Sequence, residues 1–205
     1  MFYSILKAVV KPIFYSLYGV KVFGRENTRF DGKMIMVSNH CSNYDPIFMH
    51  LLVKQKIYFM AKEELFHNWF LKKLIVSLGA FPVARGTGDM GAIKSAFKIL
   101  KRGDTLGMFP EGHRSKTGNI GKFQAGAVMI AERTATPILP VYIDGKMRIF
   151  HRNYIMVGEP INICSKLNLS LRDPDSVKLG TQYLQDRIEE MQALTKTLLH
   201  DKKKK

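Results

Sequence analysis

An apolar run leads directly into the stretch Ser38-Asn39-His40-Cys41-Ser42-Asn43-Tyr44-Asp45-Pro46. The run, Met34-Ile35-Met36-Val37, is typical of a buried strand. Along a continuous helix His40 and Asp45 would be rotated by about 500°, which places them on different faces. The two side chains can therefore meet only if the chain bends between them. Asp45 before Pro46 reads as a helix N-cap followed by the first helical residue, so the sequence predicts a strand, a turn and a helix.

Apolar runs alternate with amphipathic runs along the whole chain, which is the pattern of crossover connections in a parallel sheet. The predicted fold class is α/β, a single domain with a mostly parallel central sheet flanked by helices. Strands are predicted at 20–23, 33–38, 57–61, 80–84, 105–109, 137–143 and 154–157. Helices are predicted at 46–54, 66–78, 89–101, 124–133 and 181–199.

The composition limits the classes of partner. The chain has 205 residues, enough for one domain with a sizeable core, and 46% of them are hydrophobic, which excludes a disordered chain. Its formal net charge of +15 predicts a phosphate-rich partner: a nucleic acid, an anionic membrane or a phosphorylated substrate. Cys41 and Cys164 form neither a disulfide framework nor a C-x-x-C pair, which favours a reducing compartment.

The N-terminal segment 1–18 is apolar but interrupted by Lys7 and Lys11, whereas a membrane-spanning helix needs roughly 20 apolar residues. Ser4 and the two lysines share one helical face, which favours an amphipathic, membrane-associating helix, kinked or broken at Pro12. A helix that only packs on the domain remains an equal alternative, and a signal peptide is disfavoured because no small-residue cleavage site follows. The expected organisation is an amphipathic helix at 1–19, the α/β domain at 20–200 and a basic tail at 201–205.

Polar residues follow two further predicted strands. Arg85 follows one of them, and Glu111, Gly112 and Arg114 follow the other. Binding groups gather beyond the carboxyl ends of parallel strands, so we expect these residues to lie at the same edge of the sheet as His40. A glycine allows a sharp turn there, and the guanidinium of Arg114 suits a phosphate.

Several other interpretations find less support. Gly86-x-Gly88-x-x-Gly91 matches a dinucleotide fingerprint, but a lone glycine motif is weak, and the acidic residue at the expected distance, Glu111, belongs to another motif. A thiol nucleophile at Cys41 is disfavoured, because adjacent side chains such as Cys41 and His40 rarely point at each other. No H-x-x-x-H or C-x-x-C spacing supports a metal site. No recognised nucleic-acid-binding motif accompanies the basic charge.

Four blocks, in a fixed order between residues 39 and 141, resemble the glycerolipid acyltransferases. They are Asn39-His40-x-x-x-x-Asp45, Gly79-x-Phe81-Pro82-Val83-x-Arg85, Phe109-Pro110-Glu111-Gly112-x-Arg114-Ser115 and Ile138-Leu139-Pro140-Val141. The closest resemblance is to the branch that acylates 1-acylglycerol 3-phosphate. The chain departs from the family pattern at His113, where a small residue is usual, and at Gln124, where a lysine is common.

The resemblance implies transfer of an acyl group from a thioester, acyl-CoA or acyl carrier protein, to the sn-2 hydroxyl of lysophosphatidic acid, which gives phosphatidic acid. Another lysophospholipid or glycerol phosphate remains open as the acceptor. His40 would be the general base and Asp45 the carboxylate that orients it. No metal or redox cofactor is implied.

The same resemblance gives the expected binding residues. Arg85 and Arg114 would bind the acceptor phosphate, and Glu111 and Gly112 would shape the acceptor site. The expected partners are the two substrates and an anionic membrane surface, with no nucleic acid. We therefore expect a peripheral or monotopic protein on the cytoplasmic face of the cell membrane.

Overall fold

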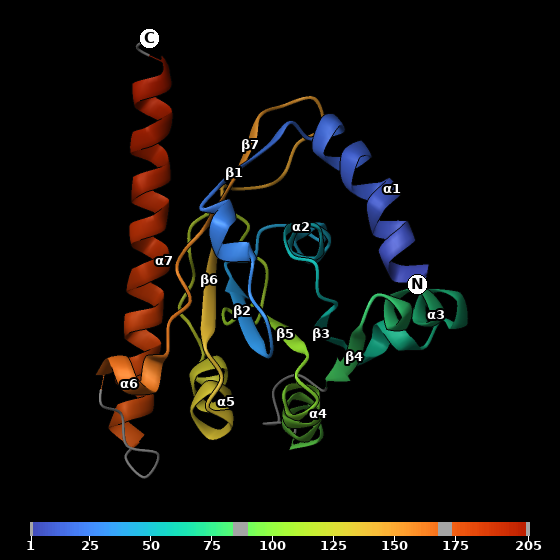
Figure 1. Cartoon of the computed structure of the whole chain (residues 1–205), viewed down its shortest axis with the longest axis vertical. Coiled ribbons are helices and arrows are strands. Elements are labelled where there is room, and N and C mark those ends of the chain that lie inside the picture. Colours follow the sequence, from blue (N-terminus) through green and yellow to red (C-terminus); the bar gives the residue numbers. More distant parts are fainter. Residues whose placement is uncertain (1, 84–89, 168–173, 204–205) are drawn as a thin grey trace.

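A seven-stranded sheet forms the centre of the described part of the chain, residues 2–83, 90–167 and 174–203 of the computed structural model (Figure 1). Its strands are β1 (Val20–Phe23), β2 (Met34–Ser38), β3 (Ile57–Lys62), β4 (Ala80–Val83), β5 (Thr105–Met108), β6 (Ile138–Ile143) and β7 (Asn153–Val157). They lie in the order β1-β7-β6-β2-β5-β3-β4, and every neighbouring pair is parallel except β6 and β7. The prediction of a mostly parallel α/β sheet is confirmed.

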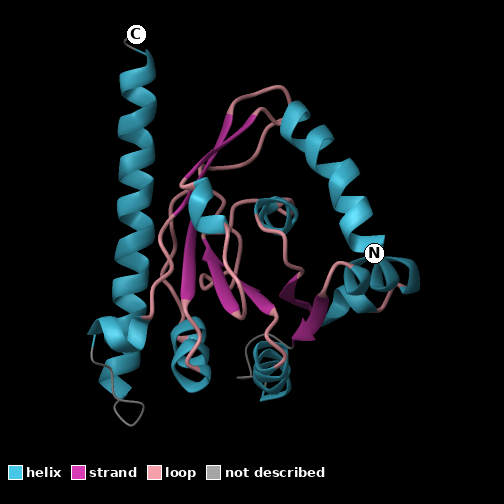
Figure 2. Cartoon of the chain, viewed as in Figure 1, coloured by secondary structure: helices cyan, strands magenta, loops and turns pink. Residues whose placement is uncertain are grey.

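Helices cover both faces of this sheet (Figure 2). They are α1 (Phe2–Leu17), α2 (Asp45–Leu52), α3 (Trp69–Ser77), α4 (Met90–Lys101), α5 (Gly126–Thr134), α6 (Ile163–Leu167) and α7 (Pro174–Lys203), with 3-10 turns η1 (Arg25–Thr28) and η2 (Glu63–Phe66). One hydrophobic cluster joins the sheet to α4, α5 and α7, and a second joins it to α1 and α2. The two faces of the sheet are therefore packed by two separate hydrophobic clusters.

Strand β2 is the central support of the fold, because it pairs with β5 on one side and β6 on the other. All five of its residues are buried. Ile35 and Val37 pack in the cluster with α4, α5 and α7, whereas Met34 and Met36 pack in the cluster with α2. Successive side chains of a strand point to opposite faces, which explains why this run is apolar without alternation.

The predicted elements are largely present, with differences at helix ends. The helix predicted at 66–78 begins only at Trp69, because the Asn68 side chain accepts hydrogen bonds from the backbone of Phe70 and Leu71 and caps the helix there. The last helix begins at Pro174 instead of residue 181, and α6 was not predicted. The predicted strand 80–84 ends at Val83, and residue 84 lies outside the described residues.

The sequence predicted a kink or a break at Pro12, and the break is wrong, because helix α1 continues through this residue. Pro12 lies on the exposed side of the helix, and the following turns are held because Phe14 and Tyr18 pack on Phe48 of α2. Within the described residues, no helix is both long enough and apolar enough to span a membrane.

Candidate active site

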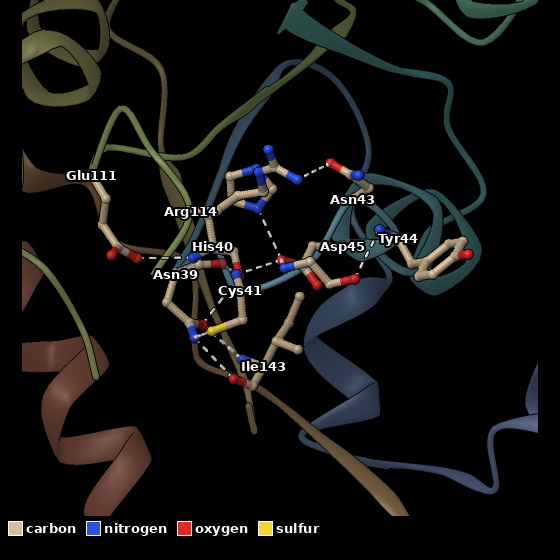
Figure 3. A network of polar contacts seen from close by, with 11 residues as sticks. Asn39, His40, Cys41, Asn43, Tyr44, Asp45, Glu111, Arg114 and Ile143 are labelled. Carbon is tan, nitrogen blue, oxygen red and sulfur yellow. Dashed lines mark hydrogen bonds and ion pairs between the residues drawn. The ribbon is translucent and has the colours of Figure 1, made fainter. Parts of the chain in front are cut away.

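The His40 and Asp45 side chains meet where the chain bends after β2 (Figure 3). The His40 Nδ1–H donates to Asp45 Oδ2 at 2.9 Å. An ionised carboxylate only accepts hydrogen bonds, so this contact places the proton on Nδ1 and leaves the lone pair of Nε2 available. The His40 side chain remains 13% exposed, whereas Asp45 is completely buried. The pair therefore has the geometry of an oriented general base at the surface of the domain.

Asp45 does not act as the helix N-cap that the sequence predicted. The cap residue is Tyr44, and Asp45 is the first residue of α2. Its carboxylate points back into the turn, where Oδ2 also accepts hydrogen bonds from the backbone N–H groups of Cys41 and Ser42, both at 2.7 Å. Asp45 Oδ2 thus binds these two amides and the imidazole, and the side chain makes no hydrogen bond to the amides of the first turn of α2. These contacts fix the bend between His40 and Asp45.

Glu111 joins the turn that carries His40 to the loop that follows β5. Its carboxylate is buried, with Oε1 accepting from the His40 backbone N–H at 2.8 Å and Oε2 from the Gly121 backbone N–H at 2.9 Å. A Cβ on Gly121 would lie 2.8 Å from Oε2, so a glycine is needed for this close approach. Because both oxygens hold backbone amides, the geometry favours a role for Glu111 in positioning His40.

Asn39 fixes the same turn from the opposite side, and no role was predicted for it. Its Nδ2 donates to the Ile143 carbonyl at 2.9 Å, and the Ile143 N–H donates to its Oδ1 at 2.8 Å. The Asn39 side-chain amide thus forms with Ile143 the same pair of hydrogen bonds that a neighbouring strand would form at the end of β6. An amide side chain directly after a buried strand was the only signal of this contact in the sequence.

Phe109 supports the imidazole ring itself, and its role was also missed. Its ring stacks on that of His40 with centroids 4.1 Å apart and planes 18° apart, and the other neighbour of Phe109 is Phe59, 5.6 Å away. Gly107 in β5 leaves space for this stack, because a Cβ there would overlap the Phe59 ring. The stack restricts the plane of the His40 ring.

Arg114 lies in the loop after β5, where Gly112 adopts a φ of +71° that suits glycine. The exposed guanidinium donates to Asn43 Oδ1 at 2.6 Å, and the neighbouring Ser115 N–H donates to the His40 carbonyl at 2.7 Å. These contacts bring the loop to the turn that carries His40. Arg85, the other predicted phosphate ligand, lies outside the described residues, as do Gly86 and Gly88.

A cationic hollow of about 340 Å³ opens in the loop after β5. Its lining includes His113, Arg114 and Lys116, together with Glu111 and Gly121. Both oxygens of the buried Glu111 carboxylate accept hydrogen bonds from backbone amides, so the exposed charged side chains of the lining are the cations Arg114 and Lys116. An anion the size of a phosphate is the ligand that this lining suits.

Cys41 has the properties of an inert thiol. Burial, followed by the nearby carboxylates of Asp45 and Glu111, raises the pKa of its thiol to about 11, so the thiolate is absent at neutral pH. Its sulfur accepts a long hydrogen bond from Asn39 Nδ2 at 3.6 Å. In the described residues, no three His, Cys, Asp or Glu side chains are grouped as a metal site.

Comparison with known proteins places this geometry in a family. The Acyltransferase family matches residues 19–144. The chain is 29% identical over 198 residues to the 1-acyl-sn-glycerol-3-phosphate acyltransferase of Bacillus subtilis, covering 93% of this chain and 96% of that protein. It is 30% identical over 212 residues to the protein of the same name from Streptococcus pneumoniae, covering 99% and 78%.

A solved structure agrees with these matches. The crystal structure of the 1-acyl-sn-glycerophosphate (LPA) acyltransferase PlsC from Thermotoga maritima aligns with a TM-score of 0.68 and 27% sequence identity, over 93% of this chain and 78% of that chain. The family match contains both members of the His40–Asp45 pair and the loop that carries Glu111 and Arg114. This chain therefore belongs to the acyltransferase family.

Proposed function

We propose that this acyltransferase transfers an acyl group from a thioester donor, acyl-CoA or acyl carrier protein, to the sn-2 hydroxyl of lysophosphatidic acid. The product is phosphatidic acid, an intermediate of phospholipid synthesis. The observation that carries the proposal is the 2.9 Å contact between His40 Nδ1 and the buried Asp45, next to a loop with a cationic hollow. The names of the related proteins support the same acceptor.

The reaction is a direct attack by the acceptor hydroxyl on the thioester. His40 Nε2 takes the hydroxyl proton as the new C–O bond forms, and general-base assistance of this kind contributes about 10²- to 10⁴-fold. Asp45 stabilises the imidazolium that results. The tetrahedral intermediate then breaks its C–S bond, and the leaving thiolate receives the proton from His40. No acyl-enzyme forms in this scheme, which agrees with the raised pKa of the Cys41 thiol.

Arg114 is the proposed ligand of the acceptor phosphate, together with Arg85. The contact with Asn43 uses one guanidinium nitrogen of Arg114, and the remaining N–H donors suit phosphate oxygens. A phosphate held there would keep the glycerol hydroxyl of the acceptor within reach of the turn that carries His40.

The proposed location is the cytoplasmic face of the cell membrane, with α1 as a peripheral or monotopic anchor. Lys7 donates to the Val53 carbonyl and is therefore turned toward the domain. Val9, Ile13 and Leu17 follow one another at every fourth position and are exposed. An apolar stripe that faces outward while the lysine faces inward suits contact with lipid.

The test is a purified-protein assay that follows thiol release with both donors. Lysophosphatidic acid, a lysophospholipid with a larger headgroup and glycerol phosphate are compared as acceptors. We expect lysophosphatidic acid to give the highest kcat/KM and His40→Ala to lower kcat by about 10²-fold or more. A preference for glycerol phosphate would overturn the acceptor, and near-normal activity of the variant would overturn the base.

A further inference from the structure

Helix α3 exposes an unusual amount of apolar surface. None of its nine residues is buried. Trp69 is 74% exposed and Phe70 is 66% exposed, and Leu74 and Val76 are also exposed. Large aromatic side chains normally lose most of their contact with water on folding, and an exposed group of them usually marks a contact surface.

The outward face of α3 alternates apolar and cationic side chains. Leu71 and Ile75 are half-buried and lie on the side of the helix that faces the domain. The opposite side carries Trp69, Lys72, Lys73 and Val76, which are at positions i, i+3, i+4 and i+7 and therefore share one face. Within the described chain, neither lysine forms an ion pair.

This combination suits a lipid surface better than another protein. The centre of a protein interface is depleted of lysine, whereas a bilayer interface accepts tryptophan at headgroup level and lysine beside lipid phosphates. The chain carries a net charge of +15, which complements an anionic leaflet over the whole molecule. We propose that the outward face of α3, defined by Trp69, Lys72, Lys73 and Val76, docks on the surface of an anionic bilayer.

The position of α3 in the fold suggests what this membrane contact does. The argument rests on the lipid acceptor proposed above. The turn η2 begins directly after β3, and β3 is separated from β2 only by β5. The connection to α3 thus leaves the sheet at the edge that carries His40. A second contact, in addition to α1, would fix the orientation of that edge relative to the leaflet from which the acceptor comes.

Trp69 is the only tryptophan in the chain, so the fluorescence of the unmodified protein reports on α3 directly. The protein is mixed with vesicles of phosphatidylcholine containing about one quarter phosphatidylglycerol. We expect the emission to shift to shorter wavelength and to be quenched by brominated lipid chains. Unchanged emission with bound protein would overturn the proposal. Emission already shifted before lipid is added, and reversed by dilution, would also overturn it, because a second copy of the chain would then cover α3.

Variants separate this surface from the rest of the molecule. Lys72→Gln with Lys73→Gln should weaken binding to these vesicles roughly 30-fold at low salt. The matched control removes the same charge from two exposed lysines of α7, Lys178→Gln with Lys196→Gln, which lies on the far side of the sheet (Figure 1), and it should weaken binding far less. Equal losses in the two double variants would contradict a specific role for α3.

An activity measurement distinguishes this proposal from the proposed function. The pair Trp69→Gln and Val76→Gln should lower turnover of lysophosphatidic acid presented in vesicles. Turnover of a short-chain, monomeric acceptor should be unchanged, because neither residue belongs to the site. A loss with both acceptors would overturn the docking role. Absence of all activity in the unmodified protein would refute the proposed function and leave the fluorescence result intact.

Discussion

A single oxygen, Asp45 Oδ2, organises the candidate site at the scale of residues. It accepts hydrogen bonds from two backbone amides and from the His40 ring. Glu111 and Asn39 then hold the backbone of the same turn from both sides. His40 is thus positioned by buried side chains that are not available to a substrate, whereas the guanidinium of Arg114 is exposed and can bind one. This difference predicts opposite kinetic effects for the two kinds of residue.

Glu111→Gln should lower kcat by about tenfold or more and leave the KM for lysophosphatidic acid nearly unchanged. A glutamine places an NH₂ group opposite one of the two backbone donors, and a lost buried hydrogen bond costs about 1–3 kcal/mol, which loosens the turn. Arg114→Gln should do the reverse and raise the acceptor KM more than it lowers kcat. Steady-state kinetics with acceptor and donor varied separately measure both. A rise in acceptor KM without loss of kcat in Glu111→Gln would contradict the positioning role.

Cys41 should be slow to react with iodoacetamide at neutral pH. Burial, followed by the charges of Asp45 and Glu111, raises its pKa to about 11, so the reactive thiolate forms only in strong alkali while the protein stays folded. The internal control is Cys164, which is less buried. Mass spectrometry should find Cys164 modified first, and Cys41→Ala should retain activity within a few-fold. An acyl group trapped on Cys41 would contradict direct attack.

At the scale of elements, the sequence was sufficient for the sheet and for most of the helices. Strands such as β2 could be predicted because their apolar runs record burial on both faces. The short helix α6 has too few turns to show a period, and it was missed. The pairing of Asn39 with Ile143 spans 104 residues, and no local pattern encodes such a contact. The N-cap was assigned wrongly because an aspartate before proline has the same local pattern whether it caps the helix or turns back.

Helix α1 shows a further limit of local patterns. Lys7 and Lys11 were expected to share the polar face of an amphipathic helix, but Lys7 donates to the carbonyl of Val53, which directly follows α2. Unpaired carbonyls at a helix C-terminus attract cations, so tertiary structure turns the lysine inward. Its pKa is lowered to about 8 by burial and by the nearby charge of Lys11. The apolar stripe then remains outside.

Val9→Gln with Ile13→Gln should weaken binding to anionic vesicles and leave the thermal midpoint nearly unchanged. Both side chains are more than half exposed, and surface substitutions of this kind change stability by about 0.5 kcal/mol or less. Deletion of the whole helix would be a poorer test, because Phe14 and Tyr18 pack in the core. Vesicle co-sedimentation measures the effect. Binding equal to that of the unmodified protein would contradict a role for α1 as an anchor.

At the scale of the whole molecule, the structure separates two functions. The carboxyl edge of the sheet gathers His40, Glu111 and Arg114 from loops that are far apart in the sequence. Helices α1 and α3 present apolar side chains to the exterior, and α7 lies on the opposite side of the sheet (Figure 1). The proposed lipid-facing helices and the proposed catalytic residues thus share one support, the central sheet, and damage to its packing should affect both.

His50 of α2 lies at a junction of that packing and should make global stability sensitive to acid. Its ring contacts Phe59 of β3 edge to face, with centroids 5.2 Å apart. Burial, followed by the charges of Lys7 and Lys56, lowers its pKa from 6.5 to about 3. Below pH 6.5 the unfolded chain binds a proton at His50 that the folded protein does not bind until about pH 3. The free energy of unfolding should therefore fall with pH across this interval, by up to about 1.4 kcal/mol per pH unit from this group.

The variant His50→Gln isolates this contribution, because glutamine does not titrate. It should be less stable than the unmodified protein at neutral pH, since it loses the packed ring, but its stability should decline less steeply between pH 6.5 and 3. Urea unfolding at a series of pH values measures both curves, and the carboxylates common to the two proteins contribute equally to them. Only the unmodified protein loses stability through His50, so its higher curve should approach that of the variant as the pH falls. Parallel curves would show that His50 takes up its proton equally in the folded and unfolded states.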